Sequence, residues 1–312
     1  MSDDAPHLQT PSHDTAERLG RRIDTSRPHP ARVYDVFLGG KDHYPADAEA
    51  ARAGLALNPR GYLDIRHNRA FLRRAVAYLA KEAGLRQFLD IGTGLPTQEN
   101  VHQIAQRIAP EARIVYVDND PVVLTHARVL LAGDPAGRTD YIEADLRDPA
   151  TILREAARTL DFDRPVGLVM AAILHFVEDE VAYDVVAELL AALPSGSHLV
   201  LSHLTADLNP EGITRMGKSM RERGLVFVFR PAARVVEFHA ANGMELIEPG
   251  LVPVHLWRPD HSADTERRIA AGGGIDAAAL ARMDDLDRTR YQDIHDVTDA
   301  DISIYASVSR KP

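Results

Sequence analysis

The chain has 312 residues, with 46 acidic against 36 basic side chains, and a formal charge of −10 when histidine is neutral. It contains no cysteine, which excludes a disulfide framework, a cysteine-ligated metal site and a thiol nucleophile. The negative charge argues against a partner with a phosphate backbone, so we expect no nucleic-acid partner.

The start of the chain is polar. Residues 1–26 are rich in Asp, His, Ser, Thr and Pro without periodicity, which predicts a disordered tail and no secretory signal. No run of 18 apolar residues occurs anywhere, so we expect no membrane segment and a cytoplasmic location.

Residues 27–83 have the spacing of helices and are interpreted as an N-terminal helical lid. A helix is predicted over 31–38, where Gly39 and Gly40 end it. A second helix is predicted over 46–56, before the break at 58–61, and a third over 65–81.

From residue 84 onward, short apolar segments alternate with helical ones. Strands are predicted over 88–91, 113–118, 141–144, 166–172 and 198–202, with helices over 98–108, 121–131, 150–160 and 178–193. Strands that are apolar throughout suit a parallel sheet covered on both faces. The fold class predicted for residues 84–312 is therefore α/β, a doubly wound Rossmann-like sheet.

The pattern is weaker after residue 205. It suggests a helix within 205–224, a short strand over 227–230, a helix over 234–241 and late strands over 245–247 and 303–308. Residues 259–300 are interpreted as an insertion, partly helical and partly mobile, whose Asp-rich stretch 284–301 forms a solvated face.

Acidic residues stand where three successive strands end. Asp90 precedes the turn that holds Gly92 and Gly94, and Asp118 and Asp145 follow the next two strands at nearly equal intervals. Ligands of open parallel sheets bind at this edge. The three carboxylates suit a ligand with a ribose, an adenine and a positive end, with Asp118 at the ribose, Asp145 at the adenine amine and Asp90 at an ammonium.

Each of these side chains also has a structural interpretation. Asp118 could cap the helix predicted from Pro121, and Asp145 could be a cap or turn residue. His175, just past the fourth strand, could be a general base or a hydrogen-bonded histidine of the rim, and His203 is a weaker candidate of the same kind. A dinucleotide fingerprint would need glycine where Thr97 stands, which disfavours a nucleotide-dependent oxidoreductase.

Several longer stretches resemble the bacterial S-adenosyl methyltransferase family, a branch of the class I S-adenosylmethionine-dependent methyltransferases. They cover roughly residues 28–258 and the final strand. The stretches are 31–35, 38–42, 68–72, 88–97, 115–121, 144–149, 174–176 and 248–252.

The resemblance implies a mostly parallel sheet with an antiparallel late strand, and S-adenosyl-L-methionine as cofactor. Gly92, Thr93 and Gly94 would line its methionine part, and the carbonyl of Ala171 would face its ammonium. Asp118 would bind the ribose. The other residues implied are Asn119, Asp145 and Leu146 at the adenine, Arg32, Tyr34, Gly40 and Asn68 in the helical lid, and Asp90 and His175 at the rim.

The function predicted is methyl transfer to a small-molecule acceptor. The alternative is a non-catalytic module that binds S-adenosylmethionine or S-adenosylhomocysteine. We expect no metal, and the sequence identifies neither a catalytic residue, nor the acceptor, nor the oligomeric state.

Overall fold

The computed structural model describes residues 24–96, 99–123, 134–259, 281–289 and 297–312. At its centre is a sheet of eight strands in the order β3-β2-β1-β4-β5-β8-β6, with β7 also paired to β8. The parallel strands are β1 (Gln87–Ile91), β2 (Arg113–Asp118), β3 (Arg138–Glu143), β4 (Gly167–Ala171) and β5 (His198–Leu204).

The late strands run the other way. β8 (Ile304–Arg310) pairs antiparallel with β5, so that Ile304 lies opposite Leu204 at the carboxyl end of β5. β6 (Glu245–Leu246) and β7 (Val252–Pro253) pair antiparallel with β8. The mostly parallel Rossmann-like sheet with antiparallel late strands is thus confirmed.

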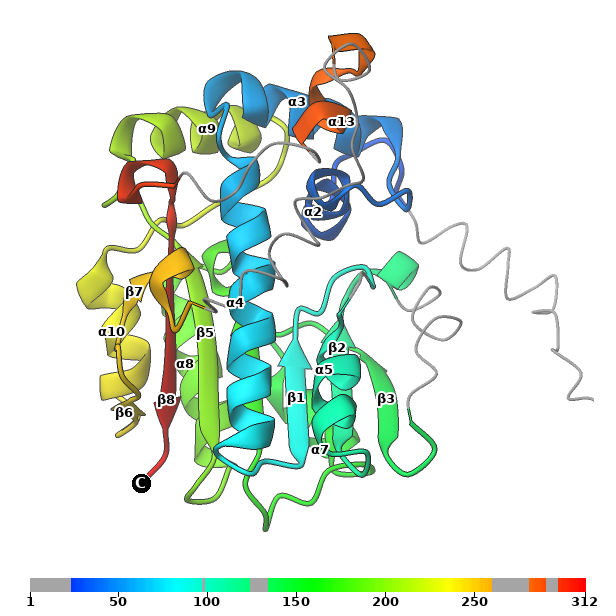
Figure 1. Cartoon of the computed structure of the whole chain (residues 1–312), viewed down its shortest axis with the longest axis vertical. Helices are drawn as coiled ribbons and strands as arrows, with labels where there is room; N and C mark the ends of the chain where they lie inside the picture. Colours follow the sequence, from blue (N-terminus) through cyan, green and yellow to red (C-terminus); the bar gives the residue numbers. More distant parts are fainter. Residues whose placement is uncertain (1–23, 97–98, 124–133, 260–280, 290–296) are drawn as a thin grey trace, which may run out of the picture.

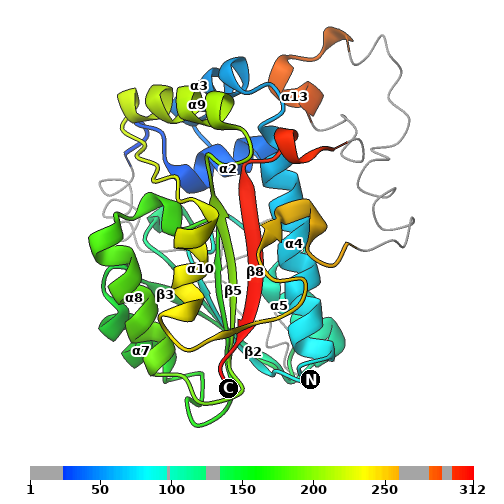
Figure 2. The ribbon, with the colours of Figure 1, turned by 90° about the vertical axis from the view of Figure 1, so that its left-hand side faces the viewer.

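Helices cover both faces of the sheet (Figure 2). α4 (Tyr62–Lys81) and α5 (Val101–Ile108) pack on one face, where Phe88 of β1 belongs to the core. α7 (Pro149–Ala156), α8 (Asp179–Ala191) and α10 (Ala232–Ala240) cover the other face, which takes the next residue, Leu89. Successive side chains of a strand point to opposite faces, and both faces here are buried, so β1 is apolar on both.

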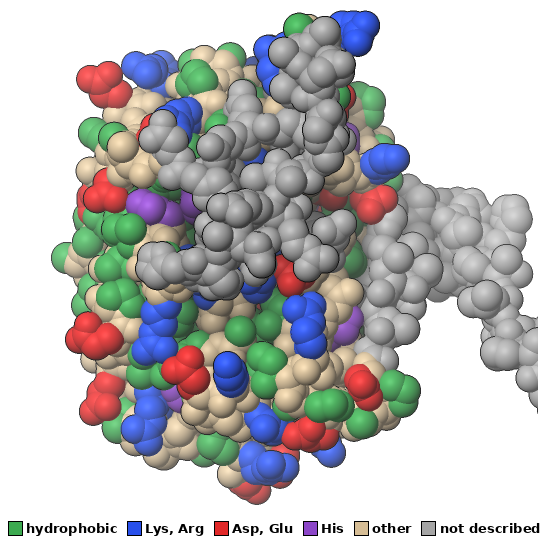
Figure 3. All heavy atoms as spheres, viewed as in Figure 1, with side chains coloured by type: hydrophobic (Ala, Val, Ile, Leu, Met, Phe, Trp, Pro, Cys, Tyr) green, Lys and Arg blue, Asp and Glu red, His purple; other side chains and the backbone are tan. Residues whose placement is uncertain are grey.

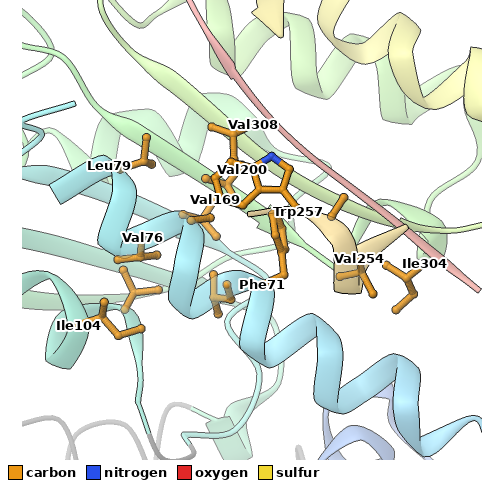
Figure 4. Packing of buried hydrophobic residues seen from close by; sticks show 14 of the residues in the cluster. Phe71, Val76, Leu79, Ile104, Val169, Val200, Val254, Trp257, Ile304 and Val308 are labelled. Atoms are coloured by element: carbon orange, nitrogen blue, oxygen red, sulfur yellow. The ribbon is translucent and has the colours of Figure 1, made fainter. Parts of the chain in front are cut away.

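The only tryptophan of the chain anchors the first of these cores (Figure 4). Trp257 is fully buried, and its ring meets Phe71 edge to face at 5.4 Å between centroids. Buried Arg74 of α4 donates from Nε to the carbonyl of Trp257 at 2.8 Å and from Nη2 to that of Val254 at 3.0 Å. These bonds hold the segment after β7 against α4 and satisfy a charge that would otherwise be costly to bury.

Three helices lie above the carboxyl ends of the strands (Figure 1): α2 (Pro30–Leu38), α3 (Pro45–Leu57) and α9 (Pro210–Glu222). α13 (Asp285–Thr289) packs against α2 and α3. α2 ends at Gly39 in the left-handed conformation, as expected from the glycine pair. Residues 27–83 therefore have two placements, since α2 and α3 cover the strand ends while α4 runs down the face of the sheet.

The predicted strands 88–91, 113–118, 141–144, 166–172 and 198–202 are all confirmed, with ends shifted by up to three residues. The strand expected over 227–230 is wrong, because this segment does not pair with a strand of the sheet. It is held by bonds from Arg230 and Val228 to the residues after β4. Arg230 is buried and donates to the carbonyls of Leu174 and Val177 at 2.8 and 2.7 Å. The amide of Val228 bonds to the carbonyl of His175 at 2.8 Å.

Some expectations fall outside the described residues: most of the tail 1–26, most of the helix 121–131, and residues 260–280 and 290–296 of the predicted insertion. Positive and negative side chains are interspersed on the face shown in Figure 3. Within the described ranges no helix is both long enough and apolar enough to cross a membrane.

Candidate active site at the carboxyl ends of the parallel strands

A cavity of about 380 Å³ opens between the strand ends and the helices above them. This volume is in the range of small-molecule sites. It is lined by twelve of the fourteen residues expected at the site: Tyr34, Asn68, Asp90, Gly92, Thr93, Gly94, Asp118, Asn119, Asp145, Leu146, Ala171 and His175. The structure therefore brings these residues together around one space.

The turn after β1 requires glycine. Gly92 has φ +73°, and a Cβ there would lie 2.5 Å from Cγ1 of Ile173. The amides of Gly92 and Thr93 donate to the carbonyl of Val117 in β2 at 2.8 and 3.2 Å, which folds the turn onto the neighbouring strand. A positive φ and a close side-chain neighbour together restrict this position to glycine.

Asp118 holds the same turn from the end of β2. Its Oδ2 accepts from the amide of Gly94 at 2.8 Å and its Oδ1 from the amide of Asp120 at 2.9 Å. Burial raises the pKa of Asp118, and these two N–H groups lower it. The interpretation of Asp118 as a cap is wrong, because Asp120 accepts from the amide of Val122 at 2.9 Å.

Asp90 is a buried carboxyl group at the end of β1. Burial raises its pKa to about 7, the charge of Arg69 lowers it and that of Asp118 raises it. A carboxyl whose ionised form is disfavoured by burial gains most from a cationic ligand, since the ligand supplies the missing counter-charge. This property fits the ammonium expected at Asp90.

Asp145 lies at the exposed end of the cavity. It accepts from the amide of Arg147 at 2.9 Å, and its carboxylate lies 3.1 Å from the Arg147 guanidinium. The helix α7 is capped by Asp148, which accepts from the amide of Thr151 at 3.1 Å. Asp145 is therefore a turn residue at the rim and not the cap of that helix.

Arg32 and Gly40, the other two expected residues, lie outside the cavity lining. Buried Arg32 donates to the carbonyls of Asp24 and Arg27 at 3.1 and 3.2 Å. At Gly40 a Cβ would overlap the carboxyl group of Asp35, which does line the cavity. Arg32 also lies 3.4 Å from the carboxylate of Asp47 in α3 and 4.0 Å from that of Asp120 after β2, so it joins α2 to both. Gly40 packs against Asp35.

A chain of hydrogen bonds links α2, α4 and the ends of two strands. Asn68 donates to the hydroxyl of Tyr34 at 2.9 Å and accepts from the hydroxyl of Ser202 at 2.6 Å. Ser202 also accepts from the amide of Ala172 at 2.9 Å, and Ala172 has φ +57°. Such a conformation is strained for alanine and persists only where the surroundings hold it.

His175 follows β4 in a short 3-10 helix, Leu174–Phe176. Its Nδ1 is buried and has no hydrogen-bond partner among the described residues. Burial lowers the pKa of His175 well below its usual value, and the nearby His203 and the charge of Arg230 lower it further. His175 is therefore a neutral imidazole that faces the cavity and takes up a proton poorly.

His203 does not line the cavity. Its Nδ1 lies 2.6 Å from the carbonyl of Leu204, and its Nε2 lies 2.8 Å from Nη1 of Arg230. Burial lowers its pKa to about 3. These contacts make it a structural histidine that helps to hold Arg230.

The expectations included Asn68 of α4 but omitted the other α4 side chains and those of α9. Asp64 and Arg69 of α4 line the cavity, as does Asp35 of α2. One signal could have identified Asp64, because it stands four residues before Asn68 and so on the same face of a helix. The α9 residues gave no such signal, since only the folded chain brings them to the strand ends.

The cavity has two sides. The rim side is formed by the segments after β1 to β4, with Asp90, Asp118 and Asp145. The lid side lies under the helices above and is mostly apolar. Its apolar residues are Phe37, Gly54, Leu204, Ile213, Met216, Met220, Leu225, Phe227 and Ile304, and the polar side chains of Tyr34, Asp35, Asn58, Asp64, Asn68 and Arg69 also line the cavity from the helices.

Comparison with known proteins shows which family this chain matches. A family model described as S-adenosyl methyltransferase matches residues 16–312. A DUF574 family protein from Streptomyces avermitilis is 46% identical, with a TM-score of 0.80 over 93% of this chain and 100% of that one. A putative methyltransferase from Thermobifida fusca is 34% identical, with a TM-score of 0.75 over 92% and 96%. No curated protein gives a significant match.

Proposed function

This chain belongs to the S-adenosyl methyltransferase family and is an S-adenosylmethionine-dependent methyltransferase, and on that premise we propose that it methylates a small molecule bound on the lid side of the cavity. The observation that carries the proposal is the pairing of two unlike compartments in one cavity. One is lined by carboxylates and the other mostly by apolar side chains. A module that only binds the cofactor would need no second compartment.

The rim side suits the cofactor on three grounds. Gly92 lets the turn after β1 fold tightly between Ile173 and the carbonyl of Val117, so that the backbone of the turn lines the cavity. Asp90 is a buried carboxyl whose ionised form lacks a full counter-charge, which suits an ammonium. Asp118 lines the cavity while its oxygens accept from backbone amides, and a carboxylate oxygen can take further donors such as ribose hydroxyls.

We assign the residues on this basis. Asp118 binds the ribose, Asn119, Asp145 and Leu146 surround the adenine, and Asp90 with the carbonyl of Ala171 holds the ammonium. Gly92, Thr93 and Gly94 line the methionine part, and His175 lies beside it. Tyr34 and Asn68 position α2 and α4 over the site. Arg32 and Gly40 do not contact the cofactor and affect the site only by fixing the position of α2 and the segments next to it.

S-adenosylmethionine supplies a methyl group already activated on a sulfonium, so the protein contributes mainly alignment and exclusion of water. The helices α2, α3 and α9 exclude water from the acceptor. The hydrogen bonds that join Asn68 to Ser202 and Tyr34 hold α4 and α2 at a fixed distance from the ends of β4 and β5. This arrangement limits the positions that an acceptor can take.

Replacement of Asp118 tests the proposal. We expect Asp118→Ala to weaken S-adenosylmethionine binding about 10- to 100-fold in calorimetric titration, since a hydrogen bond to an ionised group contributes about 1.5–3 kcal/mol. Asp118→Asn keeps one accepting oxygen for the turn and should bind with intermediate affinity. Asp163→Asn, an exposed residue at the opposite end of β4, is the matched control. Unchanged affinity in Asp118→Ala would contradict the assignment.

The expected cytoplasmic location, the absence of a nucleic-acid partner and the division of the chain into tail, lid and insertion remain predictions of the sequence.

A further inference from the structure

Two buried carboxyl groups that line the cavity are not used by the proposed function, those of Asp35 and Asp64. Asp35 is hydrogen-bonded to the amide of Asp42 and to His43. Asp64 stands in the first turn of α4, is 4% exposed and lines the cavity. Its Oδ1 accepts from the backbone amide of Ser303 at 2.6 Å, which ties the start of β8 to α4. One oxygen is thus fixed by the fold, and the carboxyl group is held at the wall of the cavity.

The position of Asp64 across the sheet separates it from the cofactor residues. The rim carboxylates follow β1, β2 and β3, whereas Ser303 precedes β8 and lies beyond β4 and β5 in the sheet order. Leu204 and Ile304, which pair at the adjoining ends of β5 and β8, also line the cavity, and Ile304 follows Ser303 directly. Asp64 therefore belongs to the space left for the acceptor.

Part of the apolar lining of the same cavity is aromatic. The ring of Phe227 lies 5.0 Å from that of Phe176 and is stacked on that of His175 at 5.7 Å. Met216 and Met220 of α9 face the same space, and thioether side chains adapt to flat apolar ligands. Such a pocket takes an aromatic molecule and offers it Asp64 as a polar group.

We infer that the acceptor is an apolar phenol and that Asp64 is the base that accepts its hydroxyl proton. This inference rests on the proposed function. In the step, the phenol proton passes to a carboxylate oxygen of Asp64 as the new O–CH₃ bond forms. The S–CH₃ bond breaks and its electron pair remains on sulfur, which leaves a neutral thioether. The protonated Asp64 then loses its proton to solvent when the product leaves.

The acid–base properties of the two candidate groups support Asp64 over His175. Burial raises the pKa of Asp64 to about 7, although hydrogen bonding from Ser303 lowers it. Burial lowers the pKa of His175. A general base is most effective when its pKa lies near the working pH, and a phenol such as that of tyrosine has a pKa of about 10. The charged and titratable groups nearest Asp64 along the chain are Arg60, Tyr62, Arg66, His67 and Arg69. Those on elements near α4 include Tyr34, His255, Asp299 and Asp301.

The test uses the full chain with 2-naphthol and 4-phenylphenol as probes. With S-adenosylhomocysteine present, we expect 2-naphthol to bind about tenfold or more tightly than naphthalene, because only the phenol donates to Asp64. At pH 6, where the carboxyl group of Asp64 is largely protonated, the cation 1-naphthylmethylammonium should bind more weakly than 2-naphthol. Tighter binding of the cation would overturn the phenol assignment in favour of an amine acceptor. A wild-type chain that binds S-adenosylmethionine but neither binds nor methylates either phenol would also overturn it.

Asp64→Asn separates a base from a structural residue, since its amide oxygen can still accept from Ser303. We expect this variant to bind S-adenosylmethionine as the wild type does and to methylate 2-naphthol about 10²- to 10⁴-fold more slowly. At saturating S-adenosylmethionine, which removes the effect of Asp90 on cofactor binding, kcat/KM for 2-naphthol should rise with pH through about 7 in the wild type. This rise should be lost in Asp64→Asn and kept in Asp163→Asn. An unchanged pH profile would overturn the role of Asp64. Failure of the proposed function would instead show as a wild type that does not bind S-adenosylmethionine.

Discussion

The two sides of the cavity are built by different kinds of interaction. On the rim side, side chains and backbone amides of neighbouring strand ends hold one another, as Asp118 holds Gly94 and Val117 holds Gly92. On the lid side, apolar side chains from α3, α9 and the segment after α9 pack together, as Met220 does with Ala50 and Leu225. Hydrogen bonds on the rim side can select one cofactor. On the lid side, substitutions that alter side-chain size would alter which acceptor fits.

The sharpest test of this difference compares two glycines with the same backbone conformation. Gly92 and Gly84 have φ +73° and +70°, but a Cβ at Gly84 meets no atom within 4 Å. Gly84→Ala should cost about 1–2 kcal/mol of unfolding free energy. Gly92→Ala should cost about 1–3 kcal/mol more from the clash with Ile173.

The two variants should also differ in cofactor binding. Gly92→Ala should lower S-adenosylmethionine affinity by about 10²-fold, because displacement of the turn misplaces the methionine part. Gly84→Ala should leave the affinity unchanged. Denaturant titration and calorimetry measure both effects, and equal losses in the two variants would show that the turn has no special part in binding.

A smaller effect is expected from the charge on the rim side. Because the folded pKa of Asp90 is raised to about 7, its ionised form is scarce at lower pH and binding of an ammonium should strengthen as pH rises through about 7. The strengthening should end near about pH 7.7–8.0, where an α-amino group loses its proton.

Asp90→Asn should weaken binding about 10- to 100-fold at pH 7.5 and remove this dependence. The sign for stability is opposite: with a raised folded pKa, the contribution of Asp90 to stability falls as pH rises from 3.8 to about 7. Calorimetric titration across pH measures the first effect and thermal unfolding the second. Affinity that does not vary with pH in the wild type would contradict the role of Asp90.

The smallest effect on cofactor binding is expected on the lid side. Met220→Ala should lower the unfolding free energy by about 2 kcal/mol. This is the lower end of the loss expected when a buried methionine is replaced by alanine, because Met220 already borders a cavity. S-adenosylmethionine affinity should stay within about twofold, since distant sites act independently. A large loss of cofactor affinity in this variant would show that the two sides are coupled.

Much of the rim could be predicted because its residues lie at the ends of strands. The spacing that places Asp90, Asp118 and Asp145 at one edge follows from the repeat of a strand and a helix, which is local to the sequence. The segment 227–230 shows the limit of this reasoning. Its apolar residues suggested a strand, but Arg230 bonds to residues around 174–179 and 203 that lie far away in the sequence.

The class of fold and the acidic character of one edge of the sheet could be inferred from residue spacing alone. These features follow from periodicity and from the direction of parallel strands. That α9 closes the apolar side of the cavity and that Arg32 joins α2 to Asp47 of α3 became apparent only in the folded chain. Burial and long-range contacts decide such matters, and neither can be read from the spacing of residues along a chain.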